Sequence, residues 1–349
     1  MQGSRAWIAA ASVGLIGFIA GAAAATAYLI GPLGYRSGNP PTARAAASPS
    51  VTPSPTATTQ AIGPSPRTRA SMAFDEARNV AVLFGGSGQA DTWTWDGKAW
   101  QQQHPAVVPP GRSGAAMTYD PERKLVLMWG GLEGTVQGGD FWSWDGSNWA
   151  QIRAATFPPA EGVSGWANPA PILTYDSKHH QVVLIRNNGF HPAAPRPLDV
   201  WTWDGSNWSQ PNITSLPPIW GTAAYDSALG SVVFFGVDAN SKPQTWTFDG
   251  AAWTQTQSVL SPTVPLDDPS PVVYFKPANT AMLVDGTGGL WAWQAGDWAQ
   301  QGQTSTLTSS IGYSVVFDSA RGVLVRFGGD APFGEQTWTS NGQSWARAA

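Results

Sequence analysis

Short apolar runs alternate with polar turns from about residue 70 to the end of the chain. Residues 115–120 form one such run, and residues 124–129 form a second that is closed by Gly130-Gly131. Residues 141–144 alternate apolar and polar, Asp145 to Asn148 turn the chain, and residues 149–152 complete the unit. Runs of this length, bounded by glycine, aspartate and asparagine, indicate β-strands. The pattern therefore predicts four strands joined as a meander.

The same unit recurs along the chain, marked by the motif Trp-x-Trp-Asp-Gly-x-x-Trp. Clear copies lie at residues 93–100, 142–149 and 201–208, and residues 246–253 carry Phe248 in place of the second tryptophan. Residues 291–298 and 338–345 are worn copies with the same internal spacing. The closing tryptophans are 45 to 59 residues apart. A period in this range indicates a repeat architecture of six units.

Spacing inside the unit is constant where strands are expected. Ten residues separate Asp75 from Gly85, and the same step joins Asp120 to Gly130. The two tryptophans around each Asp-Gly turn are five apart, so a two-residue turn makes them direct cross-strand partners. These tryptophans either pack between repeats or stack on sugars, and packing is favoured because a repeat carries its core in its constant positions. Length varies between the second and third strands, as expected of an exposed loop.

Six four-stranded units predict an all-β fold: a six-bladed β-propeller of four-stranded antiparallel blades. With its diglycines Gly85-Gly86, Gly130-Gly131 and Gly328-Gly329 and its paired aromatics, the chain resembles the kelch-type propellers, including galactose-oxidase-like ones. The copper site of galactose oxidase uses a cysteine, and this chain has none, so that chemistry is not implied. Each blade is expected to consist of its own four consecutive strands, without strand exchange between the termini.

The segment before the repeats predicts export. Residues 1–35 contain an uncharged apolar stretch from Ala6 to Tyr35, long enough for a transmembrane anchor. A cleaved signal segment is the alternative, with Ala25-Thr26-Ala27 as the cleavage site. Residues 36–66 are rich in proline, serine, threonine and alanine and predict a disordered linker. The propeller then spans residues 67–349, on the extracytoplasmic side of the cell membrane, or secreted if the segment is cleaved.

Charge and residue usage narrow the partners. All 23 acidic residues and all but three of the 19 basic ones lie beyond Pro66, which leaves the globular region at −7. A nucleic-acid partner is disfavoured, because it calls for a basic surface. Histidine spacing matches no metal motif, so neither a metal nor a cofactor is expected. The expected partners are the membrane, through the N-terminal segment, and an extracellular protein or glycan.

Candidate binding residues are those that break the repeat. Arg186, Asp285 and Arg326 stand where other units have glycine or a large apolar residue. Charge at such positions is costly unless it is paired or solvated, so these residues predict either a ligand site at the channel mouth or structural ion pairs. The ligand-binding candidates also include three residues in or beside the variable connections: Trp166, Trp220 and His191.

The predicted function is non-catalytic binding, because the sequence shows no catalytic constellation. The alternatives are an extracellular carbohydrate-active enzyme and a purely structural role in the cell envelope. A glycosidase needs two carboxylates beside the substrate. The loop-face candidates for that role are Glu133, Glu161, Asp267, Asp268 and Glu335.

Overall fold

The computed structural model describes most of the predicted propeller. It covers residues 63–133, 136–137, 139–159, 170–186, 198–213, 215–217, 220–238, 240–262, 270–301, 307, 310–332 and 334–348. The predicted N-terminal segment and all of the linker up to residue 62 lie outside these residues. Within the described ranges, no helix has the length and apolar character to cross a membrane.

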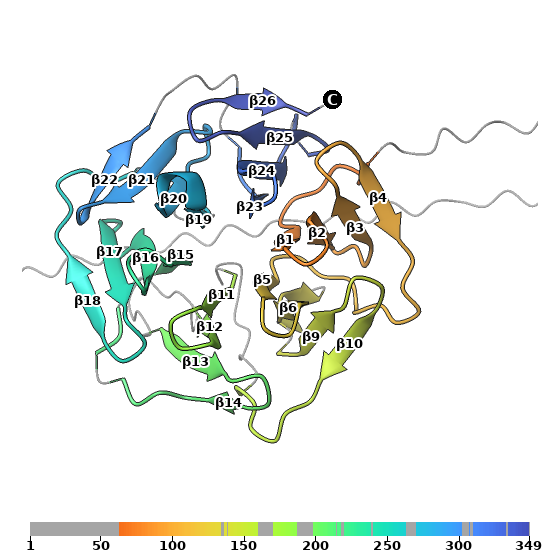
Figure 1. The fold of residues 1–349 in the computed structure, drawn as a ribbon, viewed down its shortest axis with the longest axis horizontal. Helices are drawn as coiled ribbons and strands as arrows, with labels where there is room; N and C mark the ends of the chain where they lie inside the picture. Colours follow the sequence, from red (N-terminus) through yellow and green to blue (C-terminus); the bar gives the residue numbers. More distant parts are fainter. Residues whose placement is uncertain are drawn as a thin grey trace, which may run out of the picture. The chain divides into compact units, whose positions relative to one another are not determined.

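The described residues form six four-stranded antiparallel sheets, as the repeats predict (Figure 1). Blades 1 and 2 consist of β1 (Ser71–Asp75), β2 (Val80–Phe84), β3 (Thr92–Trp95), β4 (Trp100–Gln103), and β5 (Ala116–Asp120), β6 (Leu125–Trp129), β9 (Phe141–Trp144), β10 (Trp149–Ile152). Blades 3 and 4 consist of β11 (Ile172–Asp176), β12 (Gln181–Arg186), β13 (Asp199–Trp203), β14 (Trp208–Ser209), and β15 (Trp220–Asp226), β16 (Ser231–Val237), β17 (Pro243–Phe248), β18 (Trp253–Thr256). Blades 5 and 6 consist of β19 (Val272–Phe275), β20 (Thr280–Val284), β21 (Leu290–Gln294), β22 (Asp297–Gln300), and β23 (Tyr313–Asp318), β24 (Val323–Gly328), β25 (Thr337–Ser340), β26 (Trp345–Arg347).

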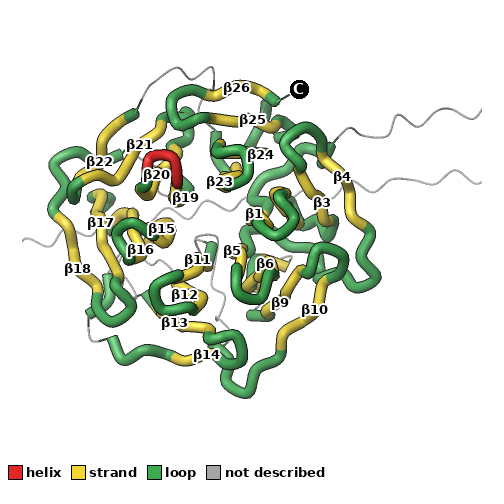
Figure 2. The backbone as a smooth tube through the Cα atoms, viewed as in Figure 1, coloured by secondary structure: helices red, strands yellow, loops and turns green. Residues whose placement is uncertain are grey.

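Two small elements interrupt the regular connections. The short strands β7 (Leu132–Glu133) and β8 (Val136–Gln137) pair between β6 and β9, and a 3₁₀ turn, Lys276–Ala278, joins β19 to β20. The first strand of each blade lies nearest the propeller axis and the fourth lies at the rim (Figures 1 and 2). Because successive strands of a blade are antiparallel, the loops between second and third strands lie at one edge of the blades, which we call the loop edge. The turns between first and second strands gather at the other, the turn edge.

The repeated tryptophans pack between blades, as the sequence analysis favoured. Trp144 pairs directly with Trp149 across β9 and β10, and Trp95 pairs with Trp100 in the same way. The ring of Trp149 meets the edge of Phe84 in the preceding blade, with centroids 5.3 Å apart. Its indole Nε1 donates to Thr92 Oγ1 of that blade at 2.9 Å. The motif therefore supplies both apolar area and a hydrogen bond at a blade boundary.

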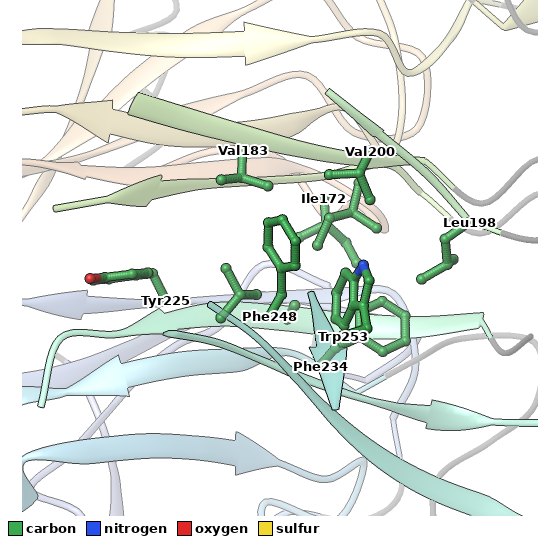
Figure 3. Close-up of a cluster of buried hydrophobic side chains, with 11 residues drawn as sticks. Ile172, Val183, Leu198, Val200, Tyr225, Phe234, Phe248 and Trp253 are labelled. Atoms are coloured by element: carbon green, nitrogen blue, oxygen red, sulfur yellow. The ribbon is translucent and has the colours of Figure 1, made fainter. Parts of the chain in front are cut away.

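The hydrophobic core is divided into six clusters, each shared by two successive blades. Figure 3 shows the cluster between blades 3 and 4, where Val183 and Val200 of one sheet face Phe234 and Trp253 of the next. A two-sided sheet buries alternate residues against opposite neighbours. This is why second strands such as β6 are continuously apolar.

The ring closes without strand exchange, as expected. Blade 1 takes all four strands from the start of the described region and blade 6 takes all four from its end. Phe327 and Trp100 pack edge to face across the boundary, with centroids 5.1 Å apart. The backbone adds hydrogen bonds: Arg67 N donates to Gly334 O at 2.9 Å, and Gly329 N donates to Arg67 O at 3.1 Å. Closure thus combines side-chain packing with backbone pairing of the chain that precedes β1.

A basic side chain at the turn edge links successive blades. In blade 1, Arg78 binds the buried Asp75 at 2.8 Å and lies over the Asp-Gly turn of blade 2. A Cβ on Gly146 in that turn would lie only 1.8 Å from Arg78 Nε. The same arrangement joins Arg123 to the Asp-Gly turn of blade 3, and Arg321 of blade 6 to that of blade 1. Glycine in the motif thus provides positive φ and also room for the neighbouring arginine.

Candidate functional site

A layer of polar side chains lies at the loop edge, at the start of the third strand or just before it, in every blade except blade 5. In blades 1 and 2, the first tryptophan of β3 and β9 donates its indole N–H to an aspartate two residues earlier. Trp93 Nε1 binds Asp91 at 2.7 Å and Trp142 Nε1 binds Asp140 at 2.6 Å. In a strand, residues two apart share a face, so the carboxylate and the indole meet without distortion.

Buried arginines complete this layer in blades 1 and 2. Arg67 contacts both oxygens of Asp91, at 2.6 and 2.9 Å, and Arg112 contacts both oxygens of Asp140, at 2.5 and 2.8 Å. Burial alone would raise the pKa of Asp91 and of Asp140, but the hydrogen bonds and the charge of the arginine hold both pKa values below 3.8. Each guanidinium also donates to the carbonyl that follows the second strand, of Gly85 or Gly130.

Arg186, a sequence candidate for ligand binding, belongs to the same layer. It ends β12 and lies directly opposite Asp199 at the start of β13. Its Nη2 donates to Asp199 Oδ2, and its Nη1 donates to Pro159 O at 2.5 Å. Blade 3 therefore has the same arginine–aspartate pair as blades 1 and 2, but its arginine comes from the end of the second strand. In blades 1 and 2 the arginine precedes the first strand. This is the structural ion pair that the sequence analysis left open beside a ligand role.

Arg326 is the second arginine candidate, and its surroundings differ. It lies on β24 with its side chain on the same face as Leu324, toward blade 5, and only 1% of the residue is exposed. Its guanidinium carbon sits 3.8 Å from the centroid of the Tyr313 ring. Among the described residues, none of Nε, Nη1 and Nη2 has a hydrogen-bond acceptor. Burial lowers the pKa of Arg326, and Tyr313, Asp285 and Asp330 partly oppose that shift.

The position of each group explains why Arg326 has no such acceptor in the described region. Eight residues before the first-strand aspartate, blades 1 and 2 have Arg67 and Arg112, whereas blade 6 has Ser310. Two residues before the tryptophan, blade 6 has Gln336 where blades 1 and 2 have aspartate. Gln336 Oε1 accepts from Trp338 Nε1 at 3.2 Å. Blade 6 thus keeps the indole contact and carries its arginine on β24, but lacks the carboxylate.

Asp285, the third pattern-breaking candidate, follows β20 on the other side of the boundary between blades 5 and 6. Its Oδ1 accepts the backbone N–H of Thr287 at 2.9 Å and that of Gly289 at 2.8 Å. Its Oδ2 accepts from Trp291 Nε1 at 3.1 Å. Blade 5 has Gly289 at the position two residues before the tryptophan, where blades 1 and 2 have aspartate. Asp285 accepts the indole hydrogen bond in its place, and it also holds the loop from Thr287 to Gly289. It is close enough to raise the pKa of Arg326, so two of the candidates meet at this boundary.

Tyr313 and Ser310 complete the boundary. The Tyr313 hydroxyl donates to Val284 O of blade 5 at 2.8 Å, which fixes its ring beneath the guanidinium of Arg326. Ser310 N donates to Gly286 O at 3.0 Å, and its buried hydroxyl has no partner among the described residues. We call Arg326, Tyr313, Ser310 and Asp285 the blade 5–6 site. Sequence reasoning missed Tyr313 and Ser310, although Ser310 is detectable as the break in the Arg67 and Arg112 spacing.

The other predicted site residues contribute less. Trp166 and His191 lie outside the described residues. Trp220 begins β15 and pairs with Val237 through its backbone. Of the five carboxylates proposed for an enzyme, Glu335 is the one whose side chain is described. It is exposed at the loop edge of blade 6.

Two cavities in the described region lie apart from the blade 5–6 site, since none of its four residues lines either of them. One, of about 360 Å³, lies between blades 6 and 1 and is lined by residues 66–68, Ser87, residues 329–332 and residues 334–335, including Asp330 and Glu335. The other, of about 290 Å³, lies on the axis and is lined by the first strands of all six blades. Within the described ranges, no three histidine, aspartate or glutamate side chains are grouped to hold a metal ion.

Comparisons with known proteins support the fold. No family model matches the chain, and no curated protein does. Solved structures do match, among them the structure of YjhT, at 12% identity, a TM-score of 0.54, and coverage of 83% of this chain and 99% of that one. The fucose-specific lectin from Aleuria aurantia matches at 11% identity and a TM-score of 0.56, covering 82% and 97%. A mutant of that lectin in complex with Fucα1-6GlcNAc matches at 11% and 0.55, covering 81% and 96%.

At 11–12% identity these likenesses concern the fold alone. They agree with the six sheets described above, and the kelch-type resemblance stays a prediction. The chain is a six-bladed β-propeller of four-stranded blades.

Proposed function

We propose that this protein is a non-catalytic glycan-binding module whose ligand contacts the blade 5–6 site at the loop edge. One observation carries the proposal: Arg326 is buried without an acceptor among the described residues, while Arg67, Arg112 and Arg186 are each paired with an aspartate. A buried charge without a partner costs several kcal/mol. A ligand that offers hydroxyl or carboxyl oxygens would recover part of that cost.

The chemistry of the site suits a sugar. Arg326 offers three nitrogen donors in a planar fork, and Ser310 offers a hydroxyl beside them. Tyr313 packs its ring against the guanidinium and holds it in place. Polar groups held rigidly against an aromatic ring are typical of pockets that orient a small polar ligand. Solved propellers of similar fold include a fucose-specific lectin, which makes glycan the first ligand class to test.

A glycan array tests this proposal directly. The protein and its Arg326→Met variant are applied to the same array, with Arg186→Met as the matched control because Arg186 already has its carboxylate. We expect a defined set of glycans to bind the wild type and the Arg186→Met variant, and to lose at least tenfold in signal with Arg326→Met. An array on which the wild type binds nothing, or on which Arg326→Met binds as well as the wild type, contradicts the proposal.

Display outside the cell is part of the same proposal and rests on the sequence of the N-terminal segment. The uncharged stretch from Ala6 to Tyr35 is long enough for an anchor and also has the features of a signal. Protease added to intact cells should digest the propeller if it is displayed, and a cleaved signal should release it to the medium. Retention of intact protein inside the cell would contradict export.

A second candidate function is a carbohydrate-active enzyme at the pocket between blades 6 and 1. Asp330 and Glu335 both line this cavity of about 360 Å³. Asp330 also accepts the backbone N–H of Ile311 at 3.0 Å, so one of its oxygens holds the loop. An enzyme of this kind should release the aryl group from chromogenic glycosides, and Glu335→Gln should abolish the release. Hydrolysis that persists unchanged in Glu335→Gln would remove this pocket as the catalytic site.

A further inference from the structure

The partners of the three paired arginines, Arg67, Arg112 and Arg186, indicate what chemical group Arg326 takes. Arg67 and Arg112 each grip a carboxylate with two nitrogens, and Arg186 contacts one through Nη2. In all three cases the carboxylate comes from the same blade. The planar fork of arginine matches the two oxygens of a carboxylate better than any other side-chain geometry.

Blade 6 supplies no such carboxylate among the described residues. Gln336 occupies the aspartate position and its amide is committed, since Oε1 accepts from Trp338 and Nε2 donates to Pro332 O at 2.9 Å. Asp285 is committed to its own loop through both oxygens. Asp330 uses one oxygen for Ile311 and is exposed at the surface. Each of these acceptors therefore serves a contact other than the guanidinium.

We propose that the blade 5–6 site binds the carboxylate of an acidic sugar, such as a uronic acid, with Arg326 taking both oxygens as Arg67 does in blade 1. The proposal rests on the glycan-binding function above and names the ligand class for that site. The ligand carboxylate replaces the aspartate that Gln336 has displaced. Ser310 contributes a hydroxyl donor at the same boundary.

Burial also favours a carboxylate over a sugar ring. Arg326 is 1% exposed, so a ligand group must be small to reach its guanidinium, and neighbouring side chains must move to admit it. A carboxylate at the edge of a sugar is small enough to meet this requirement, whereas a whole sugar ring is not. The propeller carries a net charge of −7, so long-range attraction does not bring an acidic ligand to it. Recognition must come from the short-range contact with Arg326.

Calorimetry with single sugars tests the ligand class. Glucuronate and galacturonate are titrated into the protein alongside their methyl esters, glucose, galactose and acetate. We expect saturable binding of at least one uronate and at least tenfold weaker binding of its methyl ester, because the ester loses the charge and the second equivalent oxygen. Acetate should bind more weakly than the uronate. Equal binding of acid and ester, or of uronate and acetate, overturns the proposal.

Variants separate binding from folding. Arg326→Met should abolish uronate binding and raise the unfolding temperature, since an apolar side chain of similar length replaces an unpaired buried charge. Arg186→Met should lower the unfolding temperature and leave uronate binding intact, because it orphans Asp199 in blade 3. Arg326→Lys keeps the charge but loses the fork, so uronate binding should fall at least tenfold. Uronate binding that is unchanged in Arg326→Met overturns the proposal.

Gln336→Glu restores a carboxylate two residues before Trp338. It should occupy Arg326 internally, raise the unfolding temperature and weaken uronate binding at least tenfold. Unchanged binding in this variant would show that Arg326 is not the uronate contact. If neutral glycans on the array bind in an Arg326-dependent way while uronates do not, the glycan-binding function stands and the acidic-sugar inference fails. If no glycan binds, both fail.

Discussion

Blades 1 and 6 have the same fold but complete their loop edges differently. Both carry a buried arginine beside the tryptophan that begins the third-strand motif. In blade 1, Arg67 finds Asp91, and that carboxylate also receives the indole of Trp93. In blade 6, Arg326 lies on Tyr313 and meets no acceptor in the described region. Blade 1 supplies the carboxylate for its own arginine, and blade 6 does not do so within the described residues.

This difference teaches how a repeat protein separates stability from binding. A blade that satisfies its own polar groups contributes to the ring and needs nothing else. A blade that keeps the buried cation but loses the carboxylate carries a cost of several kcal/mol, which persists only where other contacts or a ligand offset it. The turn edge has no such contrast between these two blades, since Arg78 and Arg321 make the same contacts in blades 1 and 6.

Removing a carboxylate from a complete blade should have the largest effect. Asp140→Ala leaves Arg112 buried without its partner and also removes the acceptor of Trp142. We expect a loss of about 3 kcal/mol in the free energy of unfolding, at the low end for a buried pair because the Asp140 side chain is 23% exposed. Urea denaturation measures it.

The matched substitution in blade 6 is Gln336→Ala. It removes the acceptor of Trp338 but orphans no charge, so a loss of only about 1 kcal/mol is expected. Similar losses at the two positions would mean that the paired and unpaired arginines are energetically alike, and the comparison of the blades would break.

Crowding a turn at a blade boundary should have the next largest effect. Gly146 has φ of +96°, and an added Cβ would meet Arg78 Nε at 1.8 Å. Gly146→Ala therefore adds displacement of Arg78 to a backbone cost of about 1–2 kcal/mol. We expect a total loss of about 2–3 kcal/mol, measured by urea denaturation.

Gly296→Ala in blade 5 is the control for that substitution. Its φ is +86°, but an added Cβ would meet nothing closer than Thr256 at 3.6 Å. Only the backbone cost of about 1–2 kcal/mol should remain. If both alanine variants lose the same amount, the arginine contact at the turn edge contributes nothing measurable.

Lowering the pH should reduce the stability of blades 1 and 2, in which arginine and aspartate are paired, by a smaller amount. The pKa values of Asp91 and Asp140 lie below the ordinary value in the folded protein, because hydrogen bonds and the arginine charge outweigh burial. Their contribution is therefore fully present above about pH 4 and is lost as the pH falls through the folded pKa. Thermal unfolding between pH 7 and pH 2.5 should show this loss.

Asp140→Asn sharpens that measurement. The variant should be less stable than the wild type at pH 7, and the gap should narrow as the pH falls below 4. Curves that stay parallel down to pH 2.5 would show that the Asp140 carboxylate is not held in its charged form by Arg112.

Much of the fold could be predicted from the sequence. The five-residue step between tryptophans predicted the pairs Trp95–Trp100 and Trp144–Trp149, and both form. Local turn chemistry is the reason, since an Asp-Gly turn of constant length sets the register of a hairpin. The sequence did not predict which neighbouring blade each face of a strand packs against, because a sheet that is covered on both sides has no polar face to orient it.

The candidate site was predictable in part. Arg186, Asp285 and Arg326 were visible as charges at positions where other repeats are apolar or glycine. The sequence could not separate them, since each broke the pattern in the same way. Arg186 meets Asp199 directly across the β12–β13 pair, whereas Arg326 faces blade 5 and stacks on Tyr313.

The sequence by itself determined the repeat, the number of blades and the hairpin registers, because these depend on spacing between near neighbours. Only the tertiary structure decided which arginines are paired. Arg67 and Asp91 are 24 residues apart, and Arg326 packs on Tyr313 without reaching a carboxylate in the described region, so pairing depends on how separate segments converge. The free-energy cost of a buried charge depends on its neighbours in space, and spacing along the chain does not reveal those neighbours.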